Sequence, residues 1–496
     1  MVNKNYFQIT TAIDYPSGRF HLGHAYEKIC TDVIARWKRL QGYTVHFSTG
    51  TDCHGLKIQR VSEKANKTPY EFVVEISDGF KELCKILNVS HDDFIMTTEK
   101  RHKKVAQFIL SELYKNKDIY EGYYEGPYCV DCETYYTEKD LVNGNCPIHK
   151  KPVDKIKEES YFFKLSRYQK FLIDYITKNP KCIWPEKKRK EILNRLKEPL
   201  KDLSISRKEV KWGIPLPFNK HLTEFVWVEA LNNYLTTINY PDKEYKNFWP
   251  ATHVIGSDIV WHHTAIWFSI LKSLKLEMPK VVVHGFINLK GEKLSKAANI
   301  RIDPIDLSKT YGTDALRYYL MREIPFGQDG DFSEKSLVNR LNSELADALG
   351  NLLSRTAAMI QKYNDNIIPK GTEDKSLSKQ LKFKLINEHM ENLEFHNALS
   401  EIFKYIDLCN KYINDSKPWE LAKNKKEKEL NNVLFNMAES LRIMAEMLYP
   451  FMPETSLRMH EQLGFKHRNT IDLRFGKVKS AGIQKGENLF NKIKEE

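Results

Sequence analysis

The sequence lacks a hydrophobic run long enough to cross a membrane. Spanning a bilayer takes about 20 consecutive apolar residues, whereas the longest apolar stretch, residues 259–271, is shorter and contains His262 and His263. Residues 1–9 also lack the apolar core and cleavage pattern of a secretory signal peptide. We therefore expect a cytoplasmic protein that does not associate with membranes.

Cysteine is scarce, with 8 residues in a chain of 496. That number does not form a disulfide framework in so long a chain, and three of the cysteines fall in one short segment with a histidine. A G-x-G-x-x-G fingerprint is also absent after the first predicted strand, which disfavours a dinucleotide cofactor. The clustered cysteines are therefore candidates for metal binding.

The remaining composition is that of a folded, basic protein. Hydrophobic residues make up 41% of the chain, with 25 Tyr and 25 Phe, which is too many for a disordered sequence. The length predicts about two to four domains. Lys and Arg number 77 against 65 Asp and Glu, a formal charge of +12. This excess suits a polyanionic partner such as nucleic acid, although it also simply promotes solubility.

The segment 7–24, FQITTAIDYPSGRFHLGH, organises the rest of the chain. Its first half has the apolar and threonine residues of a buried strand, DYPSG provides turn chemistry, and HLGH opens a helix that Gln41-Gly42 ends. Free backbone N–H groups at such a strand-to-helix junction attract phosphate. His21 and His24 can both face that position, although histidines at this spacing also serve as capping or packing residues.

A second strand is predicted at residues 44–48, just before the sequence GTDCHG at 50–55. Strand, helix and strand in this order form a βαβ unit of a parallel sheet, whose ligands gather beyond the carboxyl ends of the strands. HLGH and GTDCHG are therefore expected at the same edge of the sheet.

Four potential metal ligands occur as two close pairs. Cys129-x2-Cys132 is followed after thirteen residues by Cys146-x2-His149. Three thiols and one imidazole at this spacing are typical of tetrahedral Zn²⁺. Because four protein ligands leave no coordination position open, we expect a structural metal. The alternative is four unrelated reduced side chains on a loop.

The α/β pattern resumes after an insertion at about 116–220. Within the insertion, residues 158–195 have a charged, helical pattern. After it, residues 225–228 suit either a strand or the start of a buried helix. Strands are then predicted at 253–256 and 281–287, with a helix between them at 259–274. From about residue 337 only helical patterns remain.

A lysine-bearing loop, KGEKLSKA at residues 290–297, follows the last predicted strand. Read alone, two lysines in a glycine-bearing loop are a solvated surface. Because this strand belongs to the same sheet, the amines of Lys293 and Lys296 can instead close over phosphates held at His21 and His24.

These motifs together resemble those of class I aminoacyl-tRNA synthetases and, in detail, of the methionyl-tRNA synthetase family. HLGH resembles the family's HIGH-type signature, residues 293–297 its KMSKS-type loop, and the cysteine-rich segment its zinc knuckle. The resemblance covers essentially the whole chain. It implies an α/β fold, in which a Rossmann-like parallel-sheet catalytic domain is split by a zinc-knuckle insertion and followed by an all-α anticodon-binding domain.

The domain boundaries that we expect are 1–115 for the first half of the catalytic domain, 116–220 for the connective insertion, 221–290 for the second half, 291–336 for the lysine loop and stem-contact region, and 337–496 for the helical module.

The activity implied by the resemblance joins methionine and ATP to methionyl-adenylate and pyrophosphate, then transfers the methionyl group to the 3′ end of tRNA. A carboxylate is already nucleophilic, so the first step needs alignment and neutralisation of charge on the leaving pyrophosphate rather than a protein base. The expected catalytic residues are His21, His24, Lys293 and Lys296, with Mg²⁺ on the leaving phosphates. The expected ATP-binding residues are these four with Gly23 and the ribose ligand Asp258.

The resemblance also implies a methionine pocket, in which Asp52 holds the α-ammonium group and aromatic rings contact the thioether. Without it, Trp227 and Trp267 would be interpreted as core aromatics. The expected pocket residues are Ala12, Ile13, Tyr15, Asp52, Trp227, Leu231, Tyr234, Ile259, His263 and Trp267. Cys53, Leu231 and Ala297 depart from the family's usual residues and leave the pocket shape and loop mobility open.

In the helical module, Asn351, Arg355 and Trp419 resemble the family's anticodon readers. Asn351 and Arg355 lie one helical turn apart, and Trp419 can stack on a splayed base. A Pro-Trp pair by itself more often starts a helix with a buried ring. The implied ligands are L-methionine, ATP, Mg²⁺, one structural Zn²⁺ and tRNA(Met) with its CAU anticodon, and we expect a monomer.

Three other functions stay open at this point. A cysteine-type synthetase would need its zinc beside HLGH to bind a substrate thiolate, whereas the four ligands here lie in the insertion. Synthetases for valine, leucine and isoleucine carry an editing domain, which about 100 inserted residues cannot hold. The third possibility is a non-catalytic tRNA-binding protein or a small nucleotidyltransferase with an HxGH motif.

Overall fold

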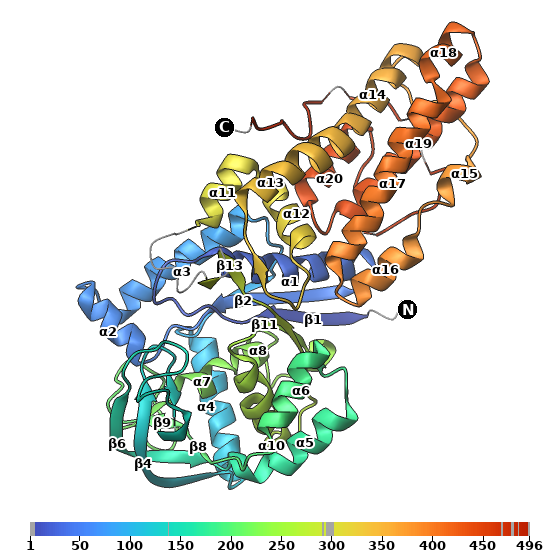
Figure 1. Ribbon diagram of the computed structural model, residues 1–496. Helices are drawn as coiled ribbons and strands as arrows, with labels where there is room; N and C mark the ends of the chain where they lie inside the picture. Colours follow the sequence, from blue (N-terminus) through green and yellow to red (C-terminus); the bar gives the residue numbers. More distant parts are fainter. Residues whose placement is uncertain are drawn as a thin grey trace.

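A six-stranded parallel sheet forms the centre of the molecule (Figure 1). The computed structural model describes residues 5–136, 138–289, 302–467, 470–477, 481–484 and 486–494, and the backbone of 292–293. The strands lie in the order β3 (Asp93–Met96), β2 (Thr44–Thr51), β1 (Tyr6–Thr11), β11 (Thr252–Gly256), β12 (Lys280–His284) and β7 (Ile183–Trp184). In the register, Ile9 of β1 is opposite Phe47 on one side and Thr252 on the other.

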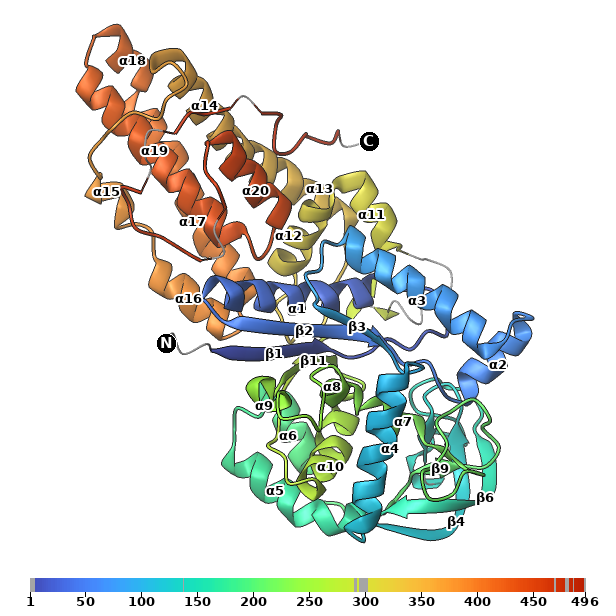
Figure 2. The ribbon, with the colours of Figure 1, turned by 180° about the vertical axis from the view of Figure 1, so that it is seen from behind.

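Helices cover both faces of this sheet, because its strands are apolar on both sides. In Figures 1 and 2, α1 and α3 lie above the sheet, and α4, α8 and α10 lie below it. The helices connecting the strands are α1 (Leu22–Leu40), α2 (Leu56–Lys64), α3 (Pro69–Ile86), α4 (Lys100–Lys115), α7 (Val226–Ala230), α8 (Asn233–Thr236), α9 (Tyr245–Phe248), the π-helix η3 (His262–Ile266) and α10 (Trp267–Ser273).

The insertion is built on a second, antiparallel sheet. Its strands are β5 (Thr134–Tyr135), β4 (Ile119–Cys129), β6 (Asp154–Phe163) and β8 (Leu203–Ser204) in spatial order. The other elements of this region are η1 (Glu138–Asp140), η2 (Leu165–Tyr168), α5 (Gln169–Lys178), α6 (Glu186–Arg195), β9 (Ser206–Arg207) and β10 (Thr223–Glu224).

β7 also comes from the segment expected to be an insertion, yet it pairs in parallel with β12 and thereby joins the central sheet. The expected domain boundaries stay predictions, but this strand belongs physically to the catalytic sheet.

The structure differs from the sequence predictions in three places. Residues 158–195 begin as a strand rather than a helix, because β6 pairs along its length with β4 and its outer half is exposed and charged. β3 is short and lies at the end of the sheet, and no strand was predicted there. The strand expected at 281–287 is two strands, β12 and β13 (Ile287–Leu289), in different sheets. Between them, a Cβ on Gly285 would lie 2.1 Å from the carbonyl oxygen of Gln328, so only glycine fits.

Helices dominate the rest of the chain, as the sequence predicted. A small sheet is formed by β13, β14 (Glu292–Lys293) and β15 (Gly330–Asp331), the last of which lies between α12 and α13. The helices are α11 (Pro304–Tyr311), α12 (Thr313–Glu323), α13 (Glu334–Arg340), the π-helix η4 (Leu341–Gly350), α14 (Asn351–Tyr363), α15 (Lys375–Ser378), α16 (Phe383–Glu391), α17 (Phe395–Ser416), α18 (Pro418–Lys423), α19 (Glu427–Leu448) and α20 (Pro453–Gln462).

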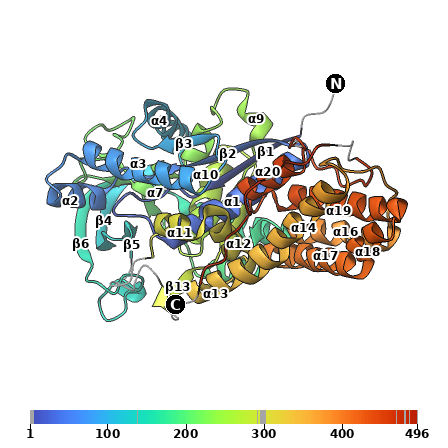
Figure 3. The ribbon, with the colours of Figure 1, turned by 90° about the horizontal axis from the view of Figure 1, so that it is seen from above.

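The bundle of these helices extends to one side of the sheet, and the hairpin of β4 and β6 lies on the other side (Figure 3). One contiguous apolar core joins the sheet to the bundle, running from Ile9 and Ile29 through Leu316 to Leu399 and Leu441. In the part of the chain that the structure describes, no helix combines the length and the apolar character that a membrane crossing requires.

Candidate active site

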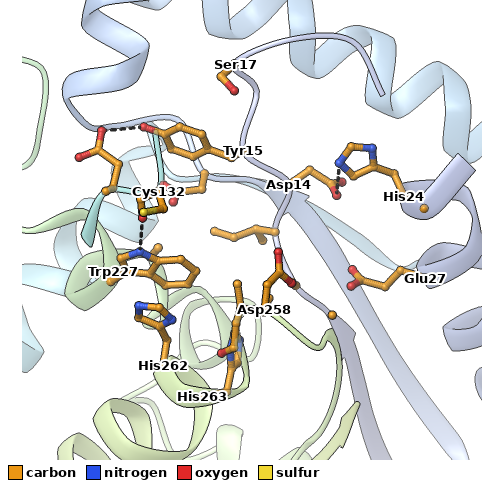
Figure 4. A pocket seen from close by; sticks show the side chains of 18 of the residues that line it. Asp14, Tyr15, Ser17, His24, Glu27, Cys132, Trp227, Asp258, His262 and His263 are labelled. Carbon is orange, nitrogen blue, oxygen red and sulfur yellow. Dashed lines mark hydrogen bonds and ion pairs between the residues drawn. The ribbon is translucent and has the colours of Figure 1, made fainter. Parts of the chain in front are cut away.

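A cavity of about 380 Å³ opens at the carboxyl edge of the parallel sheet, where the ends of β1, β2, β11 and β12 meet. The knuckle and helices α1 and α7 close it from the sides (Figure 4). The structure brings to this cavity the following predicted residues: Ala12, Ile13, Tyr15, His21, Gly23, His24, Asp52, Trp227, Leu231, Tyr234, Asp258, Ile259 and His263.

The two signature histidines cap the helix that they open. The backbone N–H of Gly23 donates to Nδ1 of His21 at 3.1 Å, and the backbone N–H of His21 donates to Nδ1 of His24 at 3.0 Å. The rings stack with centroids 3.9 Å apart. Because each Nδ1 accepts a hydrogen bond, each neutral ring carries its proton on Nε2. The capping and phosphate-binding interpretations of HLGH are therefore compatible.

Burial sets the charge of these imidazoles. It lowers the pKa of His21, although Asp258 acts in the opposite direction. It lowers the pKa of His24 well below the ordinary value, and the neighbouring His21 and Lys28 add to the effect. Both rings are thus neutral near pH 7 in the unliganded site and offer hydrogen bonds rather than charge.

A buried lysine lies beneath the histidines and was not predicted from the sequence. The Nζ atom of Lys28 is fully buried, 2.6 Å from Oδ2 of Asp14 and 3.3 Å from Oγ1 of Thr11. Burial raises the pKa of Asp14 to about 6, against the opposing effect of Lys28. Asp14 also lines the cavity, and its place directly after β1 was the signal that could have found it.

Glu27 and His284 form a second pair in the cavity wall that was not predicted. Nε2 of His284 lies 3.0 Å from Oε2 of Glu27. Burial lowers the pKa of His284, but the hydrogen bond and charge of Glu27 outweigh it and raise the pKa overall. His284 ends β12, which placed it at the ligand edge of the sheet.

Asp52 is a buried acid at the opposite end of the cavity, close to two other acids. Among the described residues, its Oδ1 is buried without a hydrogen-bond partner. Burial and the nearby Glu229 and Glu133 raise the pKa of Asp52 well above its usual value. Glu229 itself is held by His54 and His102, at 2.7 and 2.8 Å. An unpaired buried carboxylate of this kind is completed by a cation.

Aromatic rings form the wall beside Asp52. Trp227 stacks on His262 with centroids 3.9 Å apart, and the Tyr234 hydroxyl lies 2.6 Å from Nε2 of His263. Trp267 does not line the cavity. It is fully buried behind Tyr234, where its Nε1 donates to Nε2 of His253 at 3.3 Å. Sequence spacing placed Trp267 on the right helix, but not its direction.

The four predicted metal ligands converge at one point of the knuckle. The ligand atoms of Cys129, Cys132, Cys146 and His149 all lie within 4.8 Å of one another. The sulfur atoms of Cys132 and Cys146 are 3.8 Å apart. Tetrahedral Zn–S bonds of about 2.3 Å place two sulfurs about 3.8 Å apart, so the cluster fits such an ion. The structure also places Cys132 and His149 in the cavity wall.

The lysine loop lies largely outside the described residues. The backbone of Lys293 forms β14 and pairs with Asn288. The side chain of Lys293, and Lys296 and Ala297 entirely, are outside the described part of the chain. β13, which precedes the loop in the sequence, begins at the cavity with Ile287.

The predicted anticodon residues lie far from the cavity, at the distal part of the bundle where α14 and α18 are found (Figure 1). Asn351 is exposed, and Nη2 of Arg355 donates to Oδ1 of Asn414 at 2.8 Å. Trp419 is 43% exposed, so the ring is not buried at its helix start.

This fold and this site, with two histidines at the start of α1, a buried acid and an aromatic wall at the other end of the same cavity, and a separate helical module, define a class I aminoacyl-tRNA synthetase. A family model described as "tRNA synthetases class I (M)" matches residues 7–157 and 140–357, and one described as "Anticodon-binding domain of tRNA ligase" matches 380–492. The chain belongs to the methionyl-tRNA synthetase family.

Relatives and solved structures agree on this family. Proteins named Methionine--tRNA ligase from Caldanaerobacter subterraneus subsp. tengcongensis and Bacillus subtilis are each 44% identical over 99% of this chain, which spans 79% and 78% of their lengths. The structure of Mycobacterium tuberculosis methionyl-tRNA synthetase in complex with methionyl-adenylate superposes with a TM-score of 0.94, at 34% identity, covering 98% of this chain and 99% of that one. The cysteine-type and non-catalytic alternatives are therefore not favoured.

Proposed function

We propose that this protein is a methionine–tRNA ligase, which activates methionine with ATP and transfers it to the 3′ end of tRNA(Met). The observation that carries this proposal is the buried Asp52 carboxylate beside an aromatic wall, in the same cavity as the HLGH histidines. One end of the cavity suits an ammonium group and a thioether, and the other suits a nucleotide.

At the amino-acid end, Asp52 accepts the α-ammonium group in this proposal. Tyr15, Trp227 and Tyr234 surround the thioether, while Ala12, Ile13, Leu231, Ile259 and His263 complete the wall. Trp267 does not line the cavity, and it packs against the Tyr234 ring from the core side of the wall. Methionine enters with its carboxylate directed toward α1, where the triphosphate binds.

At the nucleotide end, the N-terminus of α1 and the Nε2–H groups of His21 and His24 donate hydrogen bonds to phosphate oxygens. Gly23 leaves room for the capping ring of His21, since a Cβ there would lie 2.9 Å from the Cε1 atom of that ring. Asp258 accepts from the ribose hydroxyls. The carboxylate of methionine attacks the α-phosphate, the bond to the β-phosphate breaks, and pyrophosphate leaves. Lys293 and Lys296 offset its charge, and Mg²⁺ would neutralise the phosphates further.

In the second step, the 3′-terminal ribose hydroxyl of tRNA attacks the activated carbonyl and displaces AMP. Asn351, Arg355 and Trp419 read the CAU anticodon at the far end of the bundle, where Trp419 offers an exposed stacking face. One Zn²⁺ in the knuckle serves the fold only, because all four of its positions are filled by protein. We further propose a cytoplasmic monomer with the domain boundaries given above.

The test is amino-acid-dependent exchange of labelled pyrophosphate into ATP, run with all twenty amino acids, followed by charging of tRNA(Met). Of the twenty amino acids, only methionine is expected to support the exchange. Exchange driven by another amino acid, or tRNA binding without any exchange, would contradict the proposal.

A further inference from the structure

One carboxylate of the metal knuckle reaches out of the knuckle and into the wall of the methionine cavity. Glu133 directly follows the predicted ligand Cys132, and its backbone is left-handed, with φ of 47°. The residue is 4% exposed and lines the cavity. A left-handed backbone is costly for a side-chain-bearing residue, so the surrounding contacts must hold this conformation.

Those contacts come from three separate parts of the fold. Oε1 of Glu133 accepts the backbone N–H of Lys57, at the start of α2, at 2.7 Å. The same oxygen lies 3.1 Å from the hydroxyl of Tyr15 in the loop after β1. Oε2 accepts a short hydrogen bond from the hydroxyl of Tyr128, on β4. The carboxylate therefore connects the knuckle to two segments of the catalytic domain.

The position of the Tyr15 ring depends on this carboxylate. Its hydroxyl has a single proton, shared between Glu133 and the backbone carbonyl of His54, which is 2.9 Å away. Gly55 leaves the space for the arrangement, since a Cβ there would lie 2.6 Å from the Tyr15 hydroxyl and 2.7 Å from Oε1 of Glu133. With φ of +108°, Gly55 also has a backbone that other residues rarely adopt.

A second aromatic wall residue contacts the neighbouring position of the knuckle. Nε1 of Trp227 donates to the backbone carbonyl of Cys132 at 3.5 Å, a long hydrogen bond (Figure 4). Tyr15, in the loop after β1, and Trp227, on α7, are thus both attached to the consecutive residues Cys132 and Glu133.

We infer that Glu133 is a positioning residue for methionine: it fixes the Tyr15 ring in the wall of the cavity and joins that wall to the metal knuckle. This inference rests on the proposed function, in which Tyr15 contacts the substrate. Glu133 touches no reacting atom, so it acts through Tyr15 and also places a negative charge near Asp52, where the α-ammonium group binds.

The experiment compares Glu133→Ala, Glu133→Gln, Tyr15→Phe and the Tyr15→Phe/Glu133→Ala double variant in the full chain. Pyrophosphate exchange gives kcat and the KM values for methionine and ATP, and elemental analysis gives the metal content. The matched control is Glu138→Gln, which alters an exposed carboxylate in the same region of the knuckle.

Glu133→Ala is expected to raise the KM for methionine about tenfold, because it removes a buried charged hydrogen-bond acceptor. The KM for ATP and the metal content should stay unchanged. Glu133→Gln should raise the KM for methionine by a smaller factor, because its amide oxygen can still accept the backbone N–H of Lys57. The double variant should be no worse than the poorer single variant, since both changes remove one coupled contact. The control should match the unmodified protein.

Three results would each overturn the inference. They are an equal rise in the KM values for methionine and ATP, additive effects on the KM for methionine in the double variant, and an unchanged KM for methionine. If Glu133→Ala fails to fold, the nearly isosteric Glu133→Gln decides by the same KM comparison and by the same cycle with Tyr15→Phe. Absence of methionine-dependent exchange in the unmodified protein would instead overturn the proposed function, so the two failures are distinguishable.

Discussion

Asp32 of α1 and Arg317 of α12 form an ion pair of 2.7 Å in which neither side chain is exposed to solvent. Arg317 also donates to the carbonyl oxygens of Leu87, Pro450 and Phe451, the last two just after α19. Burial raises the pKa of Asp32, but Arg36 and Arg317 outweigh it and lower the pKa to about 2. One guanidinium group therefore contacts both the helix that starts with the signature histidines and the segment that follows α19.

Replacing Arg317 by methionine is expected to lower the free energy of unfolding by about 3–5 kcal/mol, because Asp32 would keep a buried charge with one partner fewer. Urea unfolding followed by circular dichroism measures this loss. Lys85→Met is the control, since Lys85 is 81% exposed in its pair with Glu82 and such pairs contribute about 1 kcal/mol or less. Similar losses in the two variants would contradict the assignment.

Asp52→Asn is expected to raise the KM for methionine about 10- to 100-fold and to leave the KM for ATP nearly unchanged, because the amide keeps the shape but loses the charge. The affinity of the unmodified protein should also fall as the pH falls through the raised pKa of Asp52, since a protonated acid cannot pair with ammonium. Calorimetry in buffers of different ionisation enthalpy should detect proton release on methionine binding in that range. The Asn variant should show none.

Lys296→Ala is expected to slow adenylate formation about 100- to 1,000-fold with little change in methionine affinity, because its amine offsets charge that develops only as pyrophosphate leaves. Rapid-quench kinetics and equilibrium dialysis separate the two quantities. Lys309→Ala, an exposed lysine on α11, is the control. A comparable loss of rate and methionine affinity would count against this assignment.

Cys129→Ser is expected to reduce the bound zinc from about one ion per chain to well below one, because a hydroxyl is a poor zinc ligand. Elemental analysis of the purified protein measures it. Cys182→Ser should retain the metal, as Cys182 is buried in an apolar cluster away from the four ligands. Retention of the ion in both variants would show that the knuckle does not bind it.

Trp419→Ala is expected to lower kcat/KM for tRNA charging about 5- to 150-fold, the range of one lost base-stacking contact of about 1–3 kcal/mol, while methionine-dependent pyrophosphate exchange stays unchanged. Leu457→Ala, which removes an exposed apolar side chain from α20, is the control. A loss of exchange activity in the Trp419 variant would mean that the ring supports the fold rather than tRNA binding.

The sequence was sufficient to predict the parallel sheet, the helical module and the convergence of the four knuckle ligands, because each follows from local hydrophobic periodicity, chain order or ligand spacing. It was not sufficient for contacts between distant segments. Glu133 was passed over, since nothing local distinguishes it from other acids of the insertion. Trp267 was assigned to the pocket by the family resemblance, whereas the interpretation from the residues alone, a core aromatic, agrees with its buried position. β6 looked helical because its charged outer half hides the alternation of a strand.

The pairing of β7 with β12 limits which deletions leave the central sheet intact. The backbone of β12 bonds on one side to β11 and on the other to Ile183 and Trp184. Deleting residues 116–220 would remove β7 and expose the second edge of β12. This edge strand contains three consecutive buried valines and would then be able to pair with other chains and promote aggregation. A deletion that leaves this edge of β12 paired therefore has to stop short of residue 183.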